Sequence, residues 1–168
     1  MSIDTVEHLA KHLAEVLAPN SAIVCVGNEL RGDDGAGVAV ARRLTGAVPW
    51  KVYDTATVPE SFLMKIVGQK PDSVVLIDAL NFGAAAGAIE LFGSESISGQ
   101  GPSTHGPAPL AFLEVLQMMH PCRCAVLGIQ PRRTRVGESI SPPVAAAVER
   151  VVRAFAALAA EADNSPAR

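Results

Sequence analysis

The run Ser73–Asp78, with the sequence SVVLID, constrains the fold more than any other part of this chain. It is apolar from Val74 to Ile77, so a strand built from it presents apolar side chains on both of its faces. Such strands are typical of parallel sheets, in which helices cover both faces. The run Ala22–Val26 has the same character. These runs therefore predict an α/β fold in which a sheet lies between two layers of helices.

Segments with helical periodicity alternate with the strand-like runs along the chain. Strands are expected at residues 21–26, 51–54, 73–78, 88–92 and 124–129, and helices at residues 3–17, 35–44, 59–68, 110–119 and 143–160. We therefore expect a doubly wound, mostly parallel sheet with helices on both faces, forming a single α/β domain of residues 21–160. Residues 1–20 are expected to form an N-terminal helical extension, and residues 161–168 a flexible tail.

Charge and cysteine content exclude several classes of protein. The formal net charge of −3 provides no basic footprint for nucleic acid. No apolar run approaches the roughly 18 uncharged residues that would span a membrane. Charged residues at positions 4, 7, 11 and 15 interrupt the segment in which a secretory signal needs an apolar core. Three cysteines suit a reducing compartment better than a disulfide framework. We therefore expect a monomeric, cytoplasmic protein that neither binds nucleic acid nor inserts into a membrane.

Residues able to bind a metal follow the ends of the predicted strands. Asp34 follows the first strand and Asp78 ends the third. In the common strand order 2-1-3-4-5 these two strands are neighbours, and ligands bind in the crevice beyond their C-terminal ends. His105 lies in the Gly/Ser/Pro-rich loop of residues 93–109, whose length tends to be either functional or disordered. Two carboxylates and an imidazole at one crevice predict a divalent metal site with open positions.

Each of these residues also has a simpler interpretation. Asp33 or Asp34 could cap the helix that opens at Gly35, because Asp is among the best N-cap residues. Asp78 could be an ordinary polar strand end, and His105 a surface histidine. Against a phosphate site, the glycines at 27, 32, 35 and 37 lack the spacing of a dinucleotide fingerprint. Carboxylates at the helix entrance also repel a pyrophosphate, so the turn suits a cation.

Four motifs in order resemble those of the [NiFe]-hydrogenase maturation endopeptidases. They are VGNELRGDDGAGV, VVLIDAL, STHG and VLGIQP, and the resemblance covers residues 22 to about 151. In that family an acidic residue after the first strand, an aspartate ending a later strand and a loop histidine form a metal site. The resemblance places these roles on Asp34, Asp78 and His105, the trio that the fold also brings to one crevice.

The resemblance implies an endopeptidase that removes a C-terminal extension from a hydrogenase large-subunit precursor after nickel insertion. It also implies that the metal is the nickel of the precursor, so the purified protein can be metal-free. Either a bound ion or a carboxylate, as in an aspartic-type protease, could activate the attacking water. The family often has Asp-Gly-Gly-Thr after the second strand, where this chain has Asp54–Thr57. Asp54 matches and could assist catalysis or orient the loop, but the close backbone approach that the glycines allow is placed in doubt.

Two other functions stay open. A metal-dependent phosphoester hydrolase could use the paired carboxylates through Mg²⁺, although no lysine lies in the motifs. A non-catalytic hydrogenase assembly factor could keep the same fold.

Two further groups are weaker metal candidates. His8 and His12 share one helix face and could bind a metal, although a solvated helix face is the commoner arrangement. Cys122 and Cys124, close to His120, fall short of a four-ligand zinc site. Cys25 lies inside a predicted strand and is expected to be a small core residue.

Overall fold

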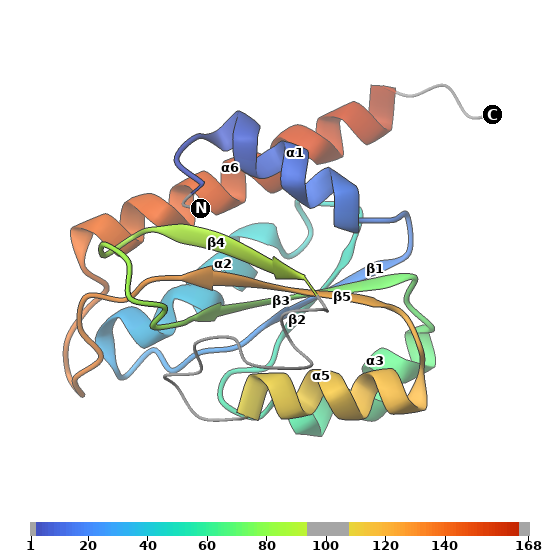
Figure 1. Ribbon diagram of the computed structural model, residues 1–168, viewed down its shortest axis with the longest axis horizontal. Coiled ribbons are helices and arrows are strands. Elements are labelled where there is room, and N and C mark those ends of the chain that lie inside the picture. Colours follow the sequence, from blue (N-terminus) through green and yellow to red (C-terminus); the bar gives the residue numbers. More distant parts are fainter. Residues whose placement is uncertain (1–2, 94–107, 165–168) are drawn as a thin grey trace.

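The computed structural model describes residues 3–93 and 108–164, and it has one five-stranded sheet with the order β2-β1-β3-β5-β4. The strands are β1 (Ser21–Cys25), β2 (Lys51–Asp54), β3 (Ser73–Ala79), β4 (Ile89–Gly93) and β5 (Arg123–Ile129). Strands β1, β2, β3 and β5 are mutually parallel, and β4 pairs antiparallel with β5 (Figure 1). The predicted fold class, a mostly parallel α/β sheet, is therefore confirmed.

The predicted strand order is correct for β2-β1-β3 but wrong at the other edge. There β5 lies beside β3, and β4 takes the outer position. The cause is the connection between Ala79 and Ile89, because a parallel crossover needs a dozen or more residues, usually with a helix. This connection is shorter, and the chain returns along the sheet in the opposite direction. The neighbouring strands that matter for the site, β1 and β3, remain adjacent.

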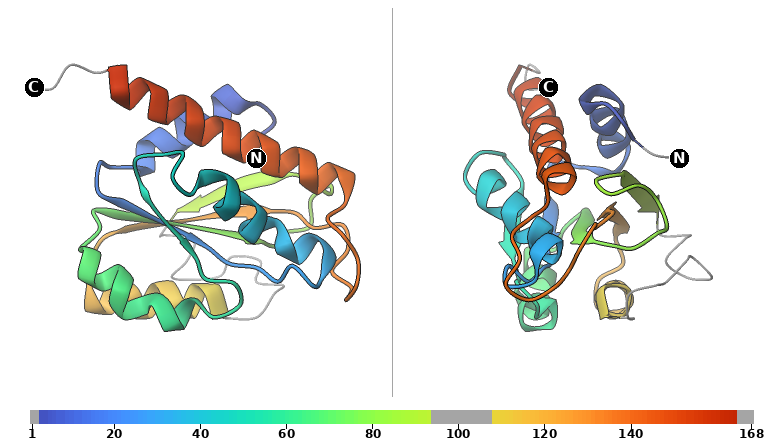
Figure 2. Two further views of the ribbon diagram at one scale, coloured as in Figure 1. Left: turned by 180° about the vertical axis from the view of Figure 1, so that it is seen from behind. Right: turned by 90° about the vertical axis from the view of Figure 1, so that its left-hand side faces the viewer.

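Helices cover both faces of the sheet, as the uninterrupted apolar strands predict (Figures 1 and 2). One face carries α1 (Val6–Val16), α2 (Ala36–Leu44) and α6 (Pro142–Asn164); the other carries α3 (Leu63–Gln69) and α5 (Ala108–Met119). Alternate residues of β1 enter the two cores: Ile23 and Cys25 face α2 and α6, whereas Ala22 and Val24 face α3 and α5. All four are fully buried.

The N-terminal helix α1 belongs to the same core as α6. Thr5 caps it by accepting a hydrogen bond from the His8 amide (3.1 Å), and Leu9 and Leu13 are completely buried in that core. At the other end of the chain, α6 continues to Asn164, four residues beyond its predicted end. The division of the chain into an extension, a domain and a tail stays a prediction. Within residues 3–93 and 108–164, no helix is both long and apolar enough to cross a bilayer.

Candidate functional site

The candidate site lies where parallel strands β1, β2 and β3 end. A short 3₁₀ turn, Gly32–Gly35, follows β1 and holds Asp34, which is half-buried. Asp78 is the second-last residue of β3 and is 7% exposed. Asp54 ends β2 and is exposed. Since Cys25 is in register with both Asp54 and Ile77, the three strands end together and bring these carboxylates to one edge of the sheet.

Glycines let the turn after β1 fold tightly onto the strand ends. A Cβ atom at Gly27 would collide with the Asp34 carbonyl oxygen, and one at Gly37 with the Val26 carbonyl oxygen. The Asn28 amide donates to the Asp34 carbonyl oxygen (2.9 Å), which fixes the turn. The glycines therefore serve close packing of α2 and its leading turn against the sheet, and they place Asp34 beside the end of β3.

Asp34 and Asp78 are electrostatically coupled. Burial raises the pKa of the Asp78 carboxyl well above its ordinary value, and the charge of Asp34 raises it further. A hydrogen bond from the Ala79 amide acts in the opposite direction without reversing the shift. Two carboxylates coupled in this way favour either protonation of one of them or a bound cation, because their mutual repulsion is relieved in both cases. The pair can therefore act in acid–base chemistry or hold a metal ion, and which of these it does stays a prediction.

Cys25 lies between the carboxylates and is inert. Its side chain is fully buried, and burial, followed by the charges of Asp54 and Asp78, raises the pKa of the thiol. A thiol held neutral in this way is a poor nucleophile. The expectation that Cys25 is a core residue is confirmed.

The turn after β2 keeps its shape without the two glycines common in the resembled family. Ala56 adopts a left-handed backbone conformation with φ of 46°, and its carbonyl oxygen accepts from the Gly27 amide (2.9 Å). Asp54 Oδ1 supports the turn by accepting from the Ala56 amide (3.2 Å). The doubt about close backbone approach at this turn is therefore removed, because an alanine takes the conformation that glycine usually provides.

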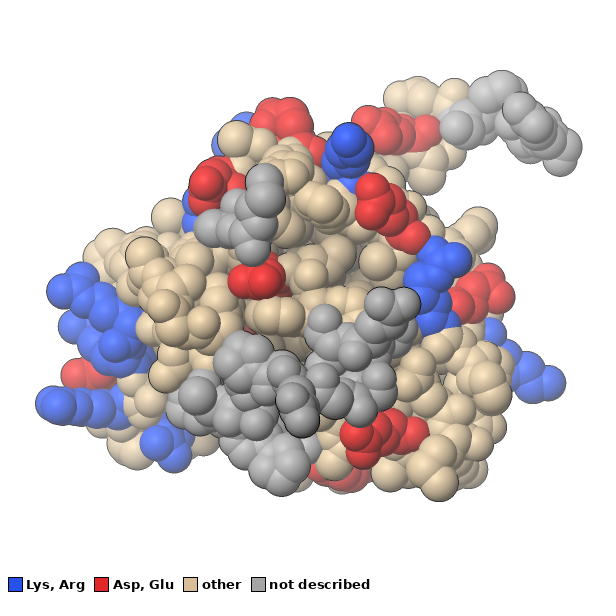
Figure 3. All heavy atoms as spheres, viewed as in Figure 1, with Lys and Arg blue, Asp and Glu red and all other residues tan. Residues whose placement is uncertain are grey.

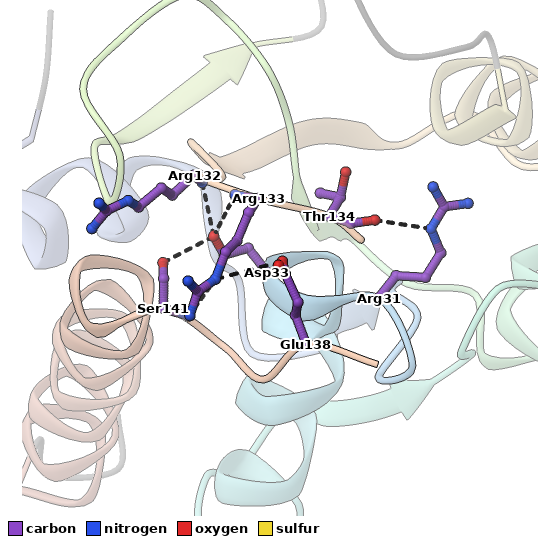
Figure 4. A network of polar contacts seen from close by, with 7 residues as sticks. All are labelled: Arg31, Asp33, Arg132, Arg133, Thr134, Glu138 and Ser141. Carbon is purple, nitrogen blue, oxygen red and sulfur yellow. Dashed lines mark hydrogen bonds and ion pairs between the residues drawn. The ribbon is translucent and has the colours of Figure 1, made fainter. Parts of the chain in front are cut away.

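Asp33 does not cap the following helix, and neither does Asp34. Helix α2 begins after Gly35 and has no side-chain cap. Asp33 is completely buried, and its carboxylate instead accepts four hydrogen bonds from the loop between β5 and α6 (Figure 4). The donors are the backbone amides of Arg132 (2.8 Å), Arg133 (2.9 Å) and Ser141 (2.6 Å) and the Ser141 hydroxyl (2.9 Å). The capping alternative is wrong for both residues.

These hydrogen bonds also decide the charge state of Asp33. Burial alone would raise the pKa of this carboxyl, but the hydrogen bonds outweigh it, led by the one from the Ser141 amide, and the pKa is lowered. Asp33 is thus an anchor, charged at neutral pH, that joins segments about one hundred residues apart. Sequence reasoning missed this role because the donors are mostly backbone amides, which leave no trace in side-chain identity.

Backbone and side-chain contacts extend the junction on both sides of Asp33. The Gly32 amide donates to the Glu138 carbonyl oxygen (3.0 Å), and Arg31 Nε donates to the Thr134 carbonyl oxygen (3.2 Å). Arg133 Nε and Glu138 Oε2 are 3.6 Å apart. Lys and Arg side chains gather at this end of the molecule (Figure 3). The turn carrying Asp34 is therefore fixed to the loop after β5 as one unit.

Gln130, in the motif VLGIQP, is a second residue whose role the sequence left open. Its Oε1 accepts from the amides of Phe82 (2.9 Å) and Ala84 (3.2 Å), and its Nε2 donates to Asn81 Oδ1 (3.1 Å). These contacts organise the connection that begins after Ala79, one residue beyond Asp78. The signal available in the sequence was the motif itself, since a buried glutamine can satisfy several backbone groups at once.

The remaining candidates fall into two groups. His105 lies outside the described residues, so its place at the crevice stays a prediction. The sulfur atoms of Cys122 and Cys124 are 3.9 Å apart. A hydrogen bond from Cys124 lowers the pKa of Cys122 to about 7; burial acts against this shift, and the charge of His120 adds to it. Among residues 3–93 and 108–164, no three His, Cys, Asp or Glu side chains are arranged to hold a metal ion.

Comparisons with known proteins agree on one family. Residues 38–158 match the family model described as hydrogenase maturation protease. The hydrogenase 3 maturation protease of Escherichia coli K12 is 30% identical over 131 residues, which is 77% of this chain and 84% of that protein. The [NiFe] hydrogenase maturation protease HycI of Thermococcus kodakarensis KOD1 has a similar structure, with a TM-score of 0.80, 29% identity, and coverage of 89% of this chain and 99% of that one. The endopeptidase HycI of Escherichia coli also has a similar structure, with a TM-score of 0.73 and 27% identity. The match covers 82% of this chain and 90% of that one.

Proposed function

The chain belongs to the hydrogenase maturation protease family, and from that premise we propose that it removes a C-terminal extension from a [NiFe]-hydrogenase large-subunit precursor after nickel insertion. The observation that carries the proposal is the coupled pair Asp34 and Asp78 at the end of β1 and β3. A buried carboxylate beside a second carboxylate has an energetic demand for a cation. Nickel already held by the precursor meets that demand.

Asp34, Asp78 and His105 are proposed to contact the nickel of the precursor. Imidazole and carboxylate are suitable ligands for this ion, and a site with few protein ligands leaves positions for those of the precursor. The ion is thus part of the substrate. Loaded precursor binds because its charge relieves the repulsion between Asp34 and Asp78, whereas nickel-free precursor leaves this repulsion in place.

Asp54 is proposed to assist the attack of water on the scissile carbonyl. Its carboxylate is exposed at the same edge, and only Oδ1 has a hydrogen-bond partner among the described residues. The second oxygen is therefore available to orient a water molecule and accept its proton. This assigns an aspartic-type hydrolysis to the site, in which water cleaves the peptide bond without a covalent intermediate.

The test is cleavage of purified precursor by metal-stripped enzyme, followed by intact-mass measurement of the large subunit. We expect nickel-loaded precursor to lose a C-terminal peptide and nickel-free precursor to stay intact, whether or not nickel is added to the protease. The variant His105→Ala should fail with both substrates. Cleavage of nickel-free precursor at an undiminished rate would show that the site does not sense nickel.

The alternatives make different predictions in the same assay. A non-catalytic assembly factor would bind the loaded precursor and leave its mass unchanged. A phosphoester hydrolase would release phosphate from a model ester with Mg²⁺, and no contact among the described residues favours that activity.

A further inference from the structure

A groove of about 470 Å³ lies between helix α1 and edge strand β4, and its described lining includes neither Asp34 nor Asp78. Among its described lining residues, the polar ones are His8, His12, Glu15 and Glu90, and the others are apolar or glycine. Gly93, at the end of β4, lines the groove and is in register with Ala125, near the start of β5. Glu90, at the other end of the lined stretch, is in register with Gly128, so the groove follows the middle of the parallel strand β5.

The two histidines are held together by a well-anchored helix. They are four residues apart on α1, which places them on one face. Leu9 and Leu13, on the adjoining face, are fully buried against the core, and Thr5 caps the helix next to His8. The histidine side chains converge: the two Nε2 atoms are 2.9 Å apart, and the ring centroids are 4.7 Å apart. This arrangement goes beyond the shared helix face that the sequence indicates.

The nitrogen separation fits a bound metal as well as a hydrogen bond. Two imidazole nitrogens about 2.1 Å from one ion, at neighbouring positions of an octahedron, are about 3.0 Å apart. In a tetrahedral site the corresponding separation is about 3.4 Å. The observed spacing therefore suits two neighbouring positions of a six-coordinate ion, which the histidines could occupy with little movement of their side chains.

The charge around the groove favours a cation. Glu15 Oε2 lies 3.9 Å from His12 Nδ1, on the opposite side of the ring from the paired nitrogen. A carboxylate near the second nitrogen of a ligating histidine orients the ring and makes it a better ligand. Glu90 adds a second negative charge to the wall, and no Lys or Arg lies among the described lining residues. Figure 3 shows acidic side chains over α1 and beside β4, with basic side chains among them.

We propose that His8 and His12 chelate a divalent transition-metal ion of the Ni²⁺ or Cu²⁺ type in this groove, separate from the site at the strand ends. The two imidazoles supply neighbouring ligands and water supplies the rest. Glu15 and Glu90 contribute charge around the ion. The proposal does not depend on the proposed function, because none of these residues lies at the ends of β1, β2 or β3.

The test is titration of the full chain with NiCl₂ near pH 7.5 by calorimetry. The variant Asp34→Asn/His105→Ala serves as background, because it lacks two of the three ligands proposed for the strand-end site. We expect one Ni²⁺ per chain, and at least a tenfold weaker affinity when either His8→Gln or His12→Gln is added. Glutamine retains polarity and helix propensity, and circular dichroism of each variant checks that the helix is kept.

Two controls make the result specific. His120→Gln changes a histidine outside the groove, whose Nε2 contacts the Pro71 carbonyl oxygen, and should leave the affinity unchanged. Paramagnetic Ni²⁺ should broaden the imidazole proton signals of His8 and His12 before those of His120. Equal affinity in the background chain and in its His8→Gln and His12→Gln derivatives, or no binding in the background chain, would show that the histidines form only a hydrogen-bonded pair.

Discussion

Asp33 and Asp78 lie at the same edge of the sheet in opposite environments. The junction around Asp33 surrounds its carboxylate with four hydrogen-bond donors, and the pKa is lowered. The end of β3 buries Asp78 beside a like charge, and the pKa is raised. A buried carboxylate with all its hydrogen bonds stabilises the fold, whereas one that lacks a counter-charge is a candidate for chemistry. Burial alone therefore does not distinguish a structural aspartate from a functional one.

The largest expected effect is the loss of activity when the Asp78 carboxylate is removed. We expect Asp78→Asn to reduce processing of nickel-loaded precursor by more than about 100-fold, because the amide cannot supply an anionic ligand. The same change should raise the free energy of unfolding at pH 7 by about 1–2 kcal/mol, since it removes the cost of a carboxyl group whose pKa is raised in the folded state. Single-turnover cleavage and urea denaturation measure the two effects. A variant that is inactive and less stable would mean that Asp78 is a structural residue like Asp33.

Replacing Asp33, whose carboxylate accepts four hydrogen bonds, should change the stability in the opposite direction. We expect Asp33→Asn to lower the free energy of unfolding by about 2–4 kcal/mol, because an amide oxygen cannot accept four hydrogen bonds and its NH₂ group faces donors. Urea denaturation of this variant and of Asp72→Asn, an exposed control, measures the difference. A loss of stability no greater than that of the control would contradict the anchoring role.

The pH dependence of stability should separate the two environments. The pKa of Asp33 is lowered in the folded state, so its contribution to stability is fully present above pH 3.8, the ordinary carboxyl pKa. That contribution is lost as the pH falls through the folded-state pKa. The pKa of Asp78 is raised in the folded state, so its destabilising effect is absent below pH 3.8. The effect grows as the pH rises above 3.8 and is complete once the pH exceeds the folded-state pKa. Denaturation from pH 3 to 8 should therefore show the advantage of wild type over Asp33→Asn shrinking in acid. The advantage of Asp78→Asn over wild type should shrink in acid as well, and a gap independent of pH for either variant would refute its assignment.

The smallest expected effect concerns the coupling within the site. We expect Asp34→Asn to lower the pKa of Asp78, because the second cause of its upward shift is the charge of Asp34. The pKa should stay above its ordinary value, since burial, the first cause, is unchanged. Carboxyl carbon chemical shifts of Asp78 followed by NMR across pH 3–9 measure the change. An unaltered titration would mean that the two carboxylates are not coupled.

Much of the fold follows from local pattern in the sequence. The apolar run that becomes β3 has no polar position to expose, so it predicts a strand covered on both faces, and alternate residues enter two cores. Because parallel strands end at one edge, the same pattern places Asp34 and Asp78 together. The glycines and carboxylates after β1 also argue against a phosphate site. In each case the outcome depends on residues close in sequence, or on a rule that holds for every parallel sheet.

The tertiary structure alone decided which of two adjacent aspartates is an anchor. Asp33 and Asp34 are the same residue type in the same turn, and the approach of the loop ending at Ser141 supplies the hydrogen-bond donors that anchor Asp33. It also decided the place of β4, through a connection too short for a crossover, and the pairing of the His8 and His12 side chains. Hydrophobic periodicity acts over a few residues and is visible in the sequence. Hydrogen bonding between segments a hundred residues apart depends on backbone groups that every residue shares, and it becomes specific only after the chain has folded.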